Sequence, residues 1–215
     1  MKNWTNLHNH TVFSMLDGHG DIEQYLTRAK SLGMRGLATT DHGNIHSWLD
    51  FYDAGTSIGV KPILGSEFYQ ARKTRFDRDP EERSGPSQNE WEQRGPYHIT
   101  ILAKNKVGYN NIIKISSRSF LEGYYVKPRI DHDLIAEHSE GIIVLSGCLN
   151  SEVCQALLRD DYAFALASAK KMQDIVGKEN YFIEVQDHGL GEQKKVFNQL
   201  VQIAETIGAK VVPSG

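Results

Sequence analysis

The chain has 215 residues, of which 40% are hydrophobic and 24% charged, and its formal net charge is -3. These values are typical of a soluble globular protein with enough residues for a sizeable core. The slightly negative charge excludes a protein that holds nucleic acid by bulk positive charge alone. No stretch approaches the roughly 20 apolar residues of a membrane span, and the N-terminus lacks a signal-peptide pattern.

The two cysteines, Cys148 and Cys154, make no disulfide framework and fit a reducing compartment. We therefore expect a cytoplasmic protein that does not associate with membranes.

Short β-rich segments alternate with helical ones along the whole chain. The predicted strands are 4–8, 36–40, 62–68, 98–104, 141–146, 181–186 and 210–213, and the predicted helices are 21–32, 44–58, 107–121, 131–138, 151–176 and 192–207. Helix boundaries carry the usual signals, such as Asp21 with Gln24 three residues later and glycines after the helical patterns. The strand 141–146 is apolar on both faces, as in a buried parallel sheet.

Such alternation predicts an α/β fold of right-handed strand–helix–strand units. Seven repeats favour a distorted seven-stranded (β/α)7 barrel over an open sheet, and no glycine-rich phosphate loop follows any strand. We expect a single domain over residues 1–215. A polar segment at about 70–97, balanced in acidic and basic residues, interrupts the pattern as an insertion.

Two histidines follow the first predicted strand in His8-Asn9-His10, and Asp17 comes seven residues later, before Gly18. Residues two apart on a strand face the same side, so both imidazoles can reach one ion. Two imidazoles and a carboxylate suit zinc or manganese, although two polar histidines at a strand end explain the motif equally well.

Other strands also deliver candidate ligands, and barrel enzymes place their sites at the C-terminal ends of strands. The candidates are His42 in Asp41-His42-Gly43, Glu67, His98, Cys148 in Gly147-Cys148, and His188 in Asp187-His188. His98 stands at the beginning of its strand rather than at its end. A carboxylate such as Glu67 is costly to bury unless it is paired or binds a metal.

These segments together resemble the polymerase-and-histidinol-phosphatase (PHP) family, and most closely the N-terminal PHP domains of bacterial DNA polymerase III alpha subunits. The additional likeness to the latter lies in residues 7–11, 124–131 and 136–143. The resemblance implies a distorted barrel that holds up to three divalent ions, zinc or manganese, with iron or magnesium as alternatives. His8, His10 and Glu67 would bind one ion, and Glu67, His98 and Cys148 a second. Asp17 and His42 would contribute to the third.

The family has two further ligands in an Asp-x-His motif just after the last strand, which here would follow Gly215. We interpret the sequence as stopping short of that motif; a partner chain that supplies both ligands, or a domain that no longer needs them, are the alternatives. The ligand types that are present favour the active form of the domain, and the resemblance implies that this form is a metal-dependent 3′–5′ exonuclease with a proofreading role. Its reaction would be attack of metal-bound hydroxide on the 3′-terminal phosphodiester.

The expected partners are a DNA 3′ end, polymerase domains of the same or a continuing chain, and other replisome subunits; no part of this chain reads as a polymerase catalytic domain. Asp41 and His188 are candidates for orienting a ligand or moving a proton. Tyr124, Lys127 and Arg129 form a candidate substrate patch. Two other functions remain open: a free-standing phosphomonoesterase of the histidinol-phosphatase kind, and a catalytically silent module that serves as a docking platform.

Overall fold

A computed structural model describes residues 4–15, 17–78 and 95–215. The central part of the predicted insertion, residues 79–94, lies outside the described residues, so its role stays a prediction.

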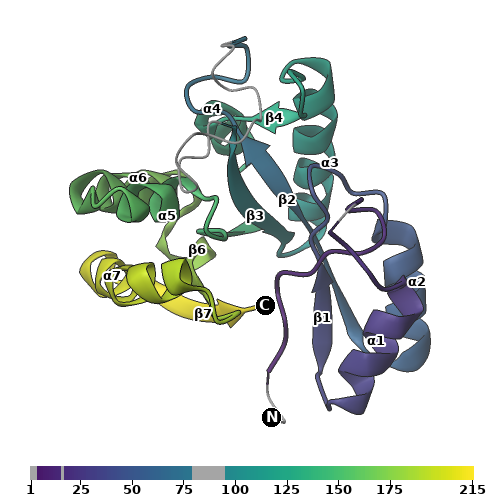
Figure 1. Cartoon of the computed structure of the whole chain (residues 1–215). Helices are drawn as coiled ribbons and strands as arrows, with labels where there is room; N and C mark the ends of the chain where they lie inside the picture. Colours follow the sequence, from purple (N-terminus) through teal and green to yellow (C-terminus); the bar gives the residue numbers. More distant parts are fainter. Residues whose placement is uncertain (1–3, 16, 79–94) are drawn as a thin grey trace.

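The described strands form one curled sheet (Figure 1). Its strands are β1 (Gly36–Thr39), β2 (Lys61–Gln70), β3 (Tyr97–Ala103), β4 (Arg129–Ile130), β5 (Ile142–Leu145), β6 (Tyr181–Gln186) and β7 (Lys210–Ser214). They are ordered β1-β2-β3-β5-β6-β7, and β4 pairs with the end of β2. The predicted α/β fold, with a sheet that curls toward a barrel, is confirmed.

The sheet is mixed, whereas the sequence predicted parallel strands throughout. Strand β3 runs antiparallel to both β2 and β5, and the other pairs are parallel. Parallel neighbours need a crossover connection, usually a helix, but antiparallel neighbours do not. The segment between β2 and β3 is the polar insertion, so the chain can return beside β2 in the opposite direction.

The first predicted strand, residues 4–8, is not a regular strand. Asn6 makes one parallel bridge to Leu37 of β1, with the Ala38 amide donating to the Asn6 carbonyl at 3.0 Å. On its other side the Asn6 side chain donates to the carbonyl of Gly215 after β7, at 3.3 Å. This N-terminal segment therefore lies between the two edge strands (Figure 1), bound to β1 by main-chain hydrogen bonds and to the end of β7 through the Asn6 side chain.

Seven α-helices are described: α1 (Ile22–Ser31), α2 (Trp48–Ile58), α3 (Lys106–Leu121), α4 (His132–Glu137), α5 (Glu152–Leu158), α6 (Tyr162–Val176) and α7 (Gly191–Ile207). The predicted helix 151–176 is two helices, because Asp160 takes a left-handed conformation (φ 60°) and Asp161 caps α6. Asp21 caps α1 as predicted, accepting from the Gln24 amide at 2.8 Å. No helix in the described ranges has the length and apolar character to cross a bilayer.

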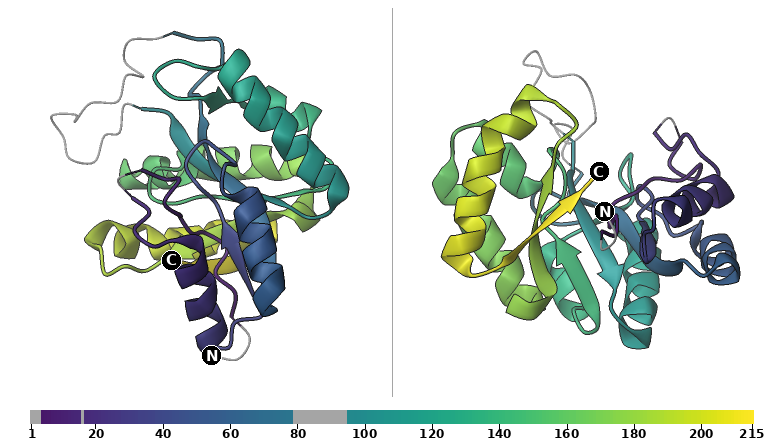
Figure 2. Two further views of the ribbon diagram at one scale, coloured as in Figure 1. Left: turned by 90° about the vertical axis from the view of Figure 1, so that its right-hand side faces the viewer. Right: turned by 90° about the horizontal axis from the view of Figure 1, so that it is seen from below.

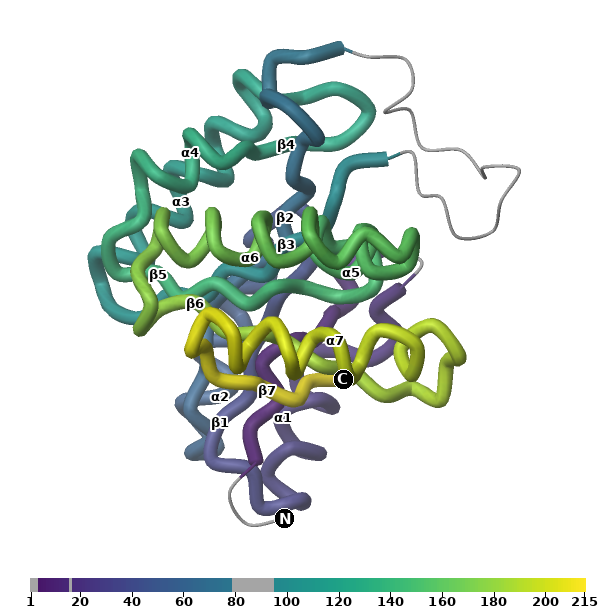
Figure 3. The backbone as a smooth tube through the Cα atoms, turned by 90° about the vertical axis from the view of Figure 1, so that its left-hand side faces the viewer, coloured from purple at the N-terminus to yellow at the C-terminus, as the bar shows by residue number. Residues whose placement is uncertain are grey.

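The helices cover the outer, convex side of the sheet (Figure 2). Helices α5, α6 and α7 lie together over the β5–β6–β7 side, and α1 and α2 cover β1 (Figure 3). The larger core contains fully buried residues such as Ile101, Ile112 and Ile183. A smaller core around Leu26 and Phe51 joins α1 and α2 to the sheet.

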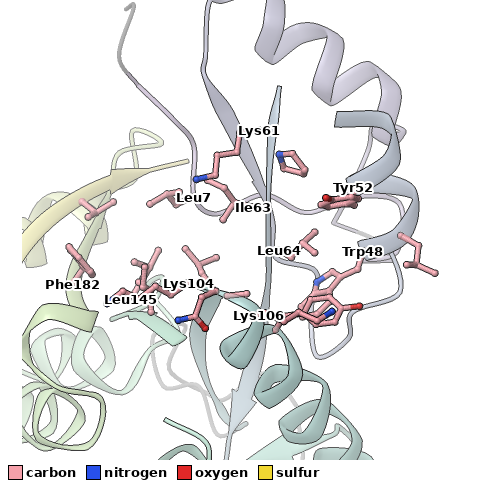
Figure 4. A pocket seen from close by; sticks show the side chains of 18 residues that line it. Leu7, Trp48, Tyr52, Lys61, Ile63, Leu64, Lys104, Lys106, Leu145 and Phe182 are labelled. Atoms are coloured by element: carbon pink, nitrogen blue, oxygen red, sulfur yellow. The ribbon is translucent and has the colours of Figure 1, made fainter. Parts of the chain in front are cut away.

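The concave side of the sheet is hollow at the end where β2, β5 and β6 begin. A cavity of about 710 Å³ is lined there by Leu7, Ile63, Leu145 and Phe182, with Lys61, Lys104 and Lys106 at its polar margin (Figure 4). The predicted ligands leave the sheet at the opposite end of these strands. The barrel axis therefore has an apolar end and an ionisable end.

Arg129 is completely buried, and its guanidinium donates to the main-chain carbonyls of Gly123, Arg75 and Asp77. The Nη1 atom of Arg75 in turn donates to both carboxylate oxygens of Asp131, at 2.8 and 3.0 Å. A buried cation with these partners ties residues 75–77 to the loop before β4. This position does not fit the surface role in substrate binding that the sequence suggested for Arg129.

Replacing Arg129 with methionine should lower the free energy of unfolding by about 3 kcal/mol, because buried carbonyl acceptors lose a charged donor. Urea unfolding monitored by circular dichroism measures the change. The exposed Arg28 of α1 supplies the control, and Arg28→Met should change stability by less than about 0.5 kcal/mol. Equal effects of the two substitutions would contradict the structural role.

Hydrogen bonds from Arg118, and then from Arg75, lower the pKa of Glu122 below its ordinary value of 4.5. A carboxylate with a lowered folded-state pKa stabilises the fold above its unfolded-state pKa, and the contribution disappears as the pH falls through the lowered value. Glu122→Gln should therefore be less stable than the parent chain at pH 7. The difference in free energy of unfolding, measured by urea unfolding at a series of pH values, should narrow as the pH falls through the lowered pKa of Glu122. A difference that does not depend on pH would refute the ion-pair origin.

Candidate metal centre

Five parts of the fold bring ligand-type side chains to one end of the sheet. His8 and His10 come from the N-terminal segment, which is held beside β1 by the Thr40 amide donating to the Asn9 carbonyl at 2.8 Å. His42 follows β1, Glu67 lies within β2, and His98 begins β3. Because β3 is antiparallel, its beginning lies at the same end as the C-terminal ends of its neighbours. This explains why His98 is placed differently along its strand.

Cys148 joins the group from the loop after β5. Gly147 has φ 91°, and a Cβ atom there would lie 2.8 Å from the His98 carbonyl oxygen. Only glycine lets this loop pass so close to β3 and present the cysteine. The Cys148 Sγ atom then lies 3.2 Å from Glu67 Oε1 and 3.7 Å from His98 Nδ1.

Glu67 is the centre of the cluster, and its side chain is 1% exposed. Its Oε1 atom lies 3.3 Å from His8 Nε2 and 3.2 Å from His98 Nδ1. Its Oε2 atom lies 2.8 Å from His42 Nδ1 and 3.5 Å from His10 Nε2. Each carboxylate oxygen therefore faces a different pair of imidazoles, which is the arrangement of a carboxylate that bridges two ions.

Asp17 completes the outer side of the cluster and is half exposed. Its Oδ2 atom lies 2.8 Å from His42 Nε2 and 3.9 Å from His10 Nε2. Gly18 permits this approach, because a Cβ at that position would lie only 1.7 Å from the Thr11 carbonyl oxygen. The two sides of the His42 ring thus face Glu67 and Asp17.

The donor atoms fit divalent ions better than they fit one another. His42 Nδ1 and Glu67 Oε2 are both buried and lie 2.8 Å apart, yet within the described ranges neither atom has a correctly directed hydrogen bond. Three groups of donor atoms each lie within 4.8 Å: His8, His10 and Glu67; His10, Asp17 and His42; and His42, Glu67 and His98. The first group matches a predicted ligand set. The second adds His10 to the predicted set of Asp17 and His42, and the third adds His42 to the predicted set that contains Glu67 and His98. Imidazole and carboxylate donors at this spacing suit divalent metals.

Charges in the cluster depend strongly on one another. Burial alone would raise the pKa of Glu67, but His8 and His98 outweigh it and hold that pKa well below its ordinary value. Burial would lower the pKa of His8, but Glu184 and Glu67 raise it well above the usual value. Burial raises the pKa of Cys148, with Glu67 adding to the effect. Without an ion, these directions place an ionised Glu67 beside a protonated His8, and the Cys148 thiol is neutral.

The comparisons with known proteins agree with this geometry. The family model described as the PHP domain matches residues 6–188, which span all seven predicted ligands. The chain belongs to the PHP family. A crystal structure of a protein described as a candidate metal-dependent phosphoesterase from Bifidobacterium adolescentis has the same fold, with a TM-score of 0.56 and 15% identity over 99% of this chain and 86% of that one.

Curated relatives place this PHP domain close to replicative polymerases. DNA polymerase III subunit alpha is 42% identical in Treponema pallidum, 41% in Thermus aquaticus and 43% in Deinococcus radiodurans. The matches cover 97%, 97% and 98% of this chain but only 17%, 17% and 16% of those subunits. The chain therefore spans about a sixth of the length of the relatives it matches.

Asp41 does not reach the cluster of this PHP domain. It is fully buried and accepts hydrogen bonds from the Thr11 amide and from Ser14 Oγ, both at 2.7 Å. Ser14 Oγ also lies 3.2 Å from His10 Nδ1. Since the Ser14 proton is given to Asp41, the oxygen is free to accept from His10, which leaves His10 Nε2 to face the cluster. The role of Asp41 in orienting a ligand stays a prediction.

His188 lies apart from the three donor groups. Gln193 holds its ring at 2.9 Å from Nδ1, and its other side faces Gly215. Of the predicted substrate residues, Tyr124 is exposed and stacks with Phe120, at 6.3 Å between ring centroids. Lys127 is nearer to the cluster: its Nζ atom lies 5.1 Å from the centroid of Tyr69.

Tyr69 connects Lys127 to the donor atoms, because its ring contacts those of His42 and His98 at 5.9 and 5.2 Å. Lys127 therefore lies at the rim of the centre and stays a candidate for contacting substrate.

One buried acidic residue beside the cluster was missed from the sequence. Glu184 of β6 has a side chain that is 0% exposed, and its Oε1 atom lies 2.7 Å from His8 Nδ1. A signal was present, because Glu184 is the acidic residue in the otherwise apolar Tyr181-Phe-Ile-Glu-Val185, at a buried position of the strand. Glu184 lies in the middle of its strand and so lacks the position at a strand end that marks the other candidates.

Replacing Glu67 with glutamine should remove or loosen at least two ions, because both oxygens of this one carboxylate face imidazole pairs. The measurement is zinc or manganese content after dialysis, by mass spectrometry, with affinities from calorimetry. Glu205→Gln, on the exposed face of α7, is the matched control and should retain all ions. Full retention of metal in Glu67→Gln would show that the ligand assignment is wrong.

Proposed function

We propose that this chain is the phosphoesterase domain of a replicative polymerase alpha subunit, and that it removes nucleotides from DNA 3′ ends. The observation that carries the proposal is Glu67, a buried carboxylate whose two oxygens face separate imidazole pairs. A bridged set of ions is the arrangement that hydrolyses phosphate esters in many enzymes. The similarity to DNA polymerase III alpha subunits supports DNA as the substrate.

The donor set supports zinc or manganese as the resident ions. His8, His10 and Glu67 would hold one, and Glu67, His98 and Cys148 a second, with His42 and Asp17 around a third. Imidazole is a good ligand for zinc, a thiolate favours it further, and carboxylates also suit manganese.

When bound, such ions lower the pKa of water and neutralise charge that develops on the phosphate oxygens. The protein residues contribute position rather than a covalent nucleophile. Glu67 and His8 are buried, and the side chains of His10, His42 and His98 are 18%, 21% and 14% exposed, so the surrounding fold restricts the positions of the donor atoms. Asp17 is the exposed member, so the phosphodiester would approach from its side.

Lys127 and Tyr69 flank that approach. A lysine at the rim would contact a DNA phosphate, and the tyrosine ring would keep its ammonium group close to the centre. Water attacks phosphorus, the bond to the 3′ oxygen of the remaining strand breaks, and a nucleoside monophosphate leaves. We propose that residues 1–215 form a single domain for this reaction, with polymerase activity residing elsewhere in the relatives' longer chains.

The test compares two substrates on the zinc- or manganese-loaded chain: a primer–template with a mismatched 3′ end, and a small phosphomonoester such as p-nitrophenyl phosphate. Nucleotide release from the primer should exceed hydrolysis of the monoester. Glu67→Gln should lower release by roughly 100-fold or more, since it disrupts the bridge. Lys127→Gln should raise KM for DNA severalfold while leaving metal content unchanged.

Each other outcome selects a different function. Preference for the monoester would contradict the exonuclease and favour a phosphomonoesterase of the histidinol-phosphatase kind. A chain that keeps its metals and degrades neither substrate would contradict catalysis and favour a silent docking module. Glu205→Gln serves as the control and should match the parent chain in every assay.

A further inference from the structure

Glu184 is buried in the wall of the barrel beside the centre, outside the three donor groups. Three donors converge on its Oε1 atom: His8 Nδ1 at 2.7 Å, Gln186 Nε2 at 3.3 Å, and Ser214 Oγ. A buried carboxylate costs several kcal/mol unless it is paired, and here hydrogen bonds offset that cost on one oxygen only. Its Oε2 atom is buried and has no hydrogen-bond partner among the described residues.

His8 lies between two carboxylates and presents a different nitrogen to each. Its Nδ1 atom faces Glu184 at 2.7 Å, and its Nε2 atom faces Glu67 at 3.3 Å. A neutral imidazole carries one proton, so a strong acceptor at Nδ1 leaves the Nε2 lone pair free. Ligating histidines commonly have such a carboxylate behind them, which fixes the ring and makes it a better donor.

The other neighbours of His8 Nδ1 cannot replace this acceptor. Gln186 Nε2, at 3.5 Å, is an amide nitrogen that only donates. Thr100 Oγ1, at 3.3 Å, is a weaker neutral acceptor than a carboxylate and lies farther away. Glu184 therefore provides the short, charged contact at this nitrogen.

We propose that Glu184 is a positioning residue of the metal centre: it keeps the proton of His8 on Nδ1 and so directs Nε2 to the ion shared with Glu67. It acts through His8 and does not itself contact an ion. The inference goes beyond the proposed phosphoesterase activity and rests only on the proposed metal centre, so it is tested by metal binding rather than by hydrolysis.

The experiment measures Zn²⁺ affinity by chelator competition for the parent chain, Glu184→Gln and Glu184→Asp. Glutamine keeps the shape but loses the charge, and its amide can donate to Nδ1 and move the His8 proton to Nε2. Glu184→Gln should bind the ion at His8 10- to 100-fold more weakly, a typical cost of losing such a partner. Glu184→Asp, which keeps an anionic acceptor, should recover part of the affinity.

The tautomer supplies a readout that a purely structural role would not change. Nitrogen-15 spectra of the zinc-loaded chain, with the His8 signals assigned by their loss in His8→Gln, should show a proton on Nδ1. In Glu184→Gln the Nδ1-protonated fraction should fall. An unchanged tautomer together with unchanged affinity would overturn the proposal.

Ser214→Ala is the matched control, because it removes another hydrogen bond to Glu184 without touching His8. It should leave zinc affinity within about threefold of the parent value. If Ser214→Ala weakened binding as much as Glu184→Gln, general disturbance of β6 and β7 would explain both, and the positioning role would be refuted. Loss of an entire ion in Glu184→Gln, with the remaining sites unaffected, would instead make Glu184 a ligand.

Thermal unfolding of the metal-free variants excludes loss of the fold as the cause. Glu184→Gln loses the ion pair with His8, so the metal-free variant should be less stable than the parent, but it should still unfold in one cooperative transition above the temperature of the binding assay. If hydrolysis is absent in every variant while these affinity differences hold, the proposed function fails and the inference about Glu184 stands.

Discussion

The carboxylate of Glu67 is the constraint on which the rest of this end of the barrel depends. A negative charge that is 1% exposed requires compensation, and the fold supplies four imidazoles from three different segments. Each oxygen receives its own pair. The consequence is a preorganised cavity of donor atoms that have too few protons and hydrogen bonds to satisfy one another, which is the condition that divalent ions relieve.

Partners outside the donor groups hold two of these imidazoles in place. Asp41 accepts a hydrogen bond from Ser14, whose oxygen lies 3.2 Å from His10 Nδ1, and Glu184 contacts His8 directly. Both carboxylates are buried, and neither belongs to a donor group. The centre is therefore built in two layers, with the outer layer fixing where the inner nitrogens point.

Much of the fold and of the inner layer could be predicted from short stretches of sequence. Such stretches show the alternation of strands and helices, and they place His8, His42, Glu67 and His98 next to predicted strands. The direction of β3 could not, since an antiparallel return leaves the same apolar pattern as a parallel strand. The break between α5 and α6 depends on a single left-handed residue within a continuous helical pattern. Residues whose role depends on a distant partner were the hardest.

Arg129 and Glu184 illustrate that last difficulty in opposite directions. In the sequence, next to Tyr124 and Lys127, Arg129 resembles a surface cation. Only the folded structure shows that its guanidinium donates hydrogen bonds to main-chain carbonyls. Glu184 resembles an isolated acidic residue in a strand until His8, 176 positions away, is placed beside it. Local patterns reveal what a side chain can do, and long-range contacts decide whether it does so.

The irregular N-terminal segment closes the barrel between its two edge strands. One side of the segment is bound to β1 by main-chain hydrogen bonds, and the other side contacts the opposite edge through the Asn6 side chain and the His8–Glu184 contact. The atoms that make this closing contact are thus neighbours of the atoms that would coordinate the ions. An ion held by His8 would therefore lie beside the contact between this segment and β6, so metal binding and closure of the barrel would depend on the same residue.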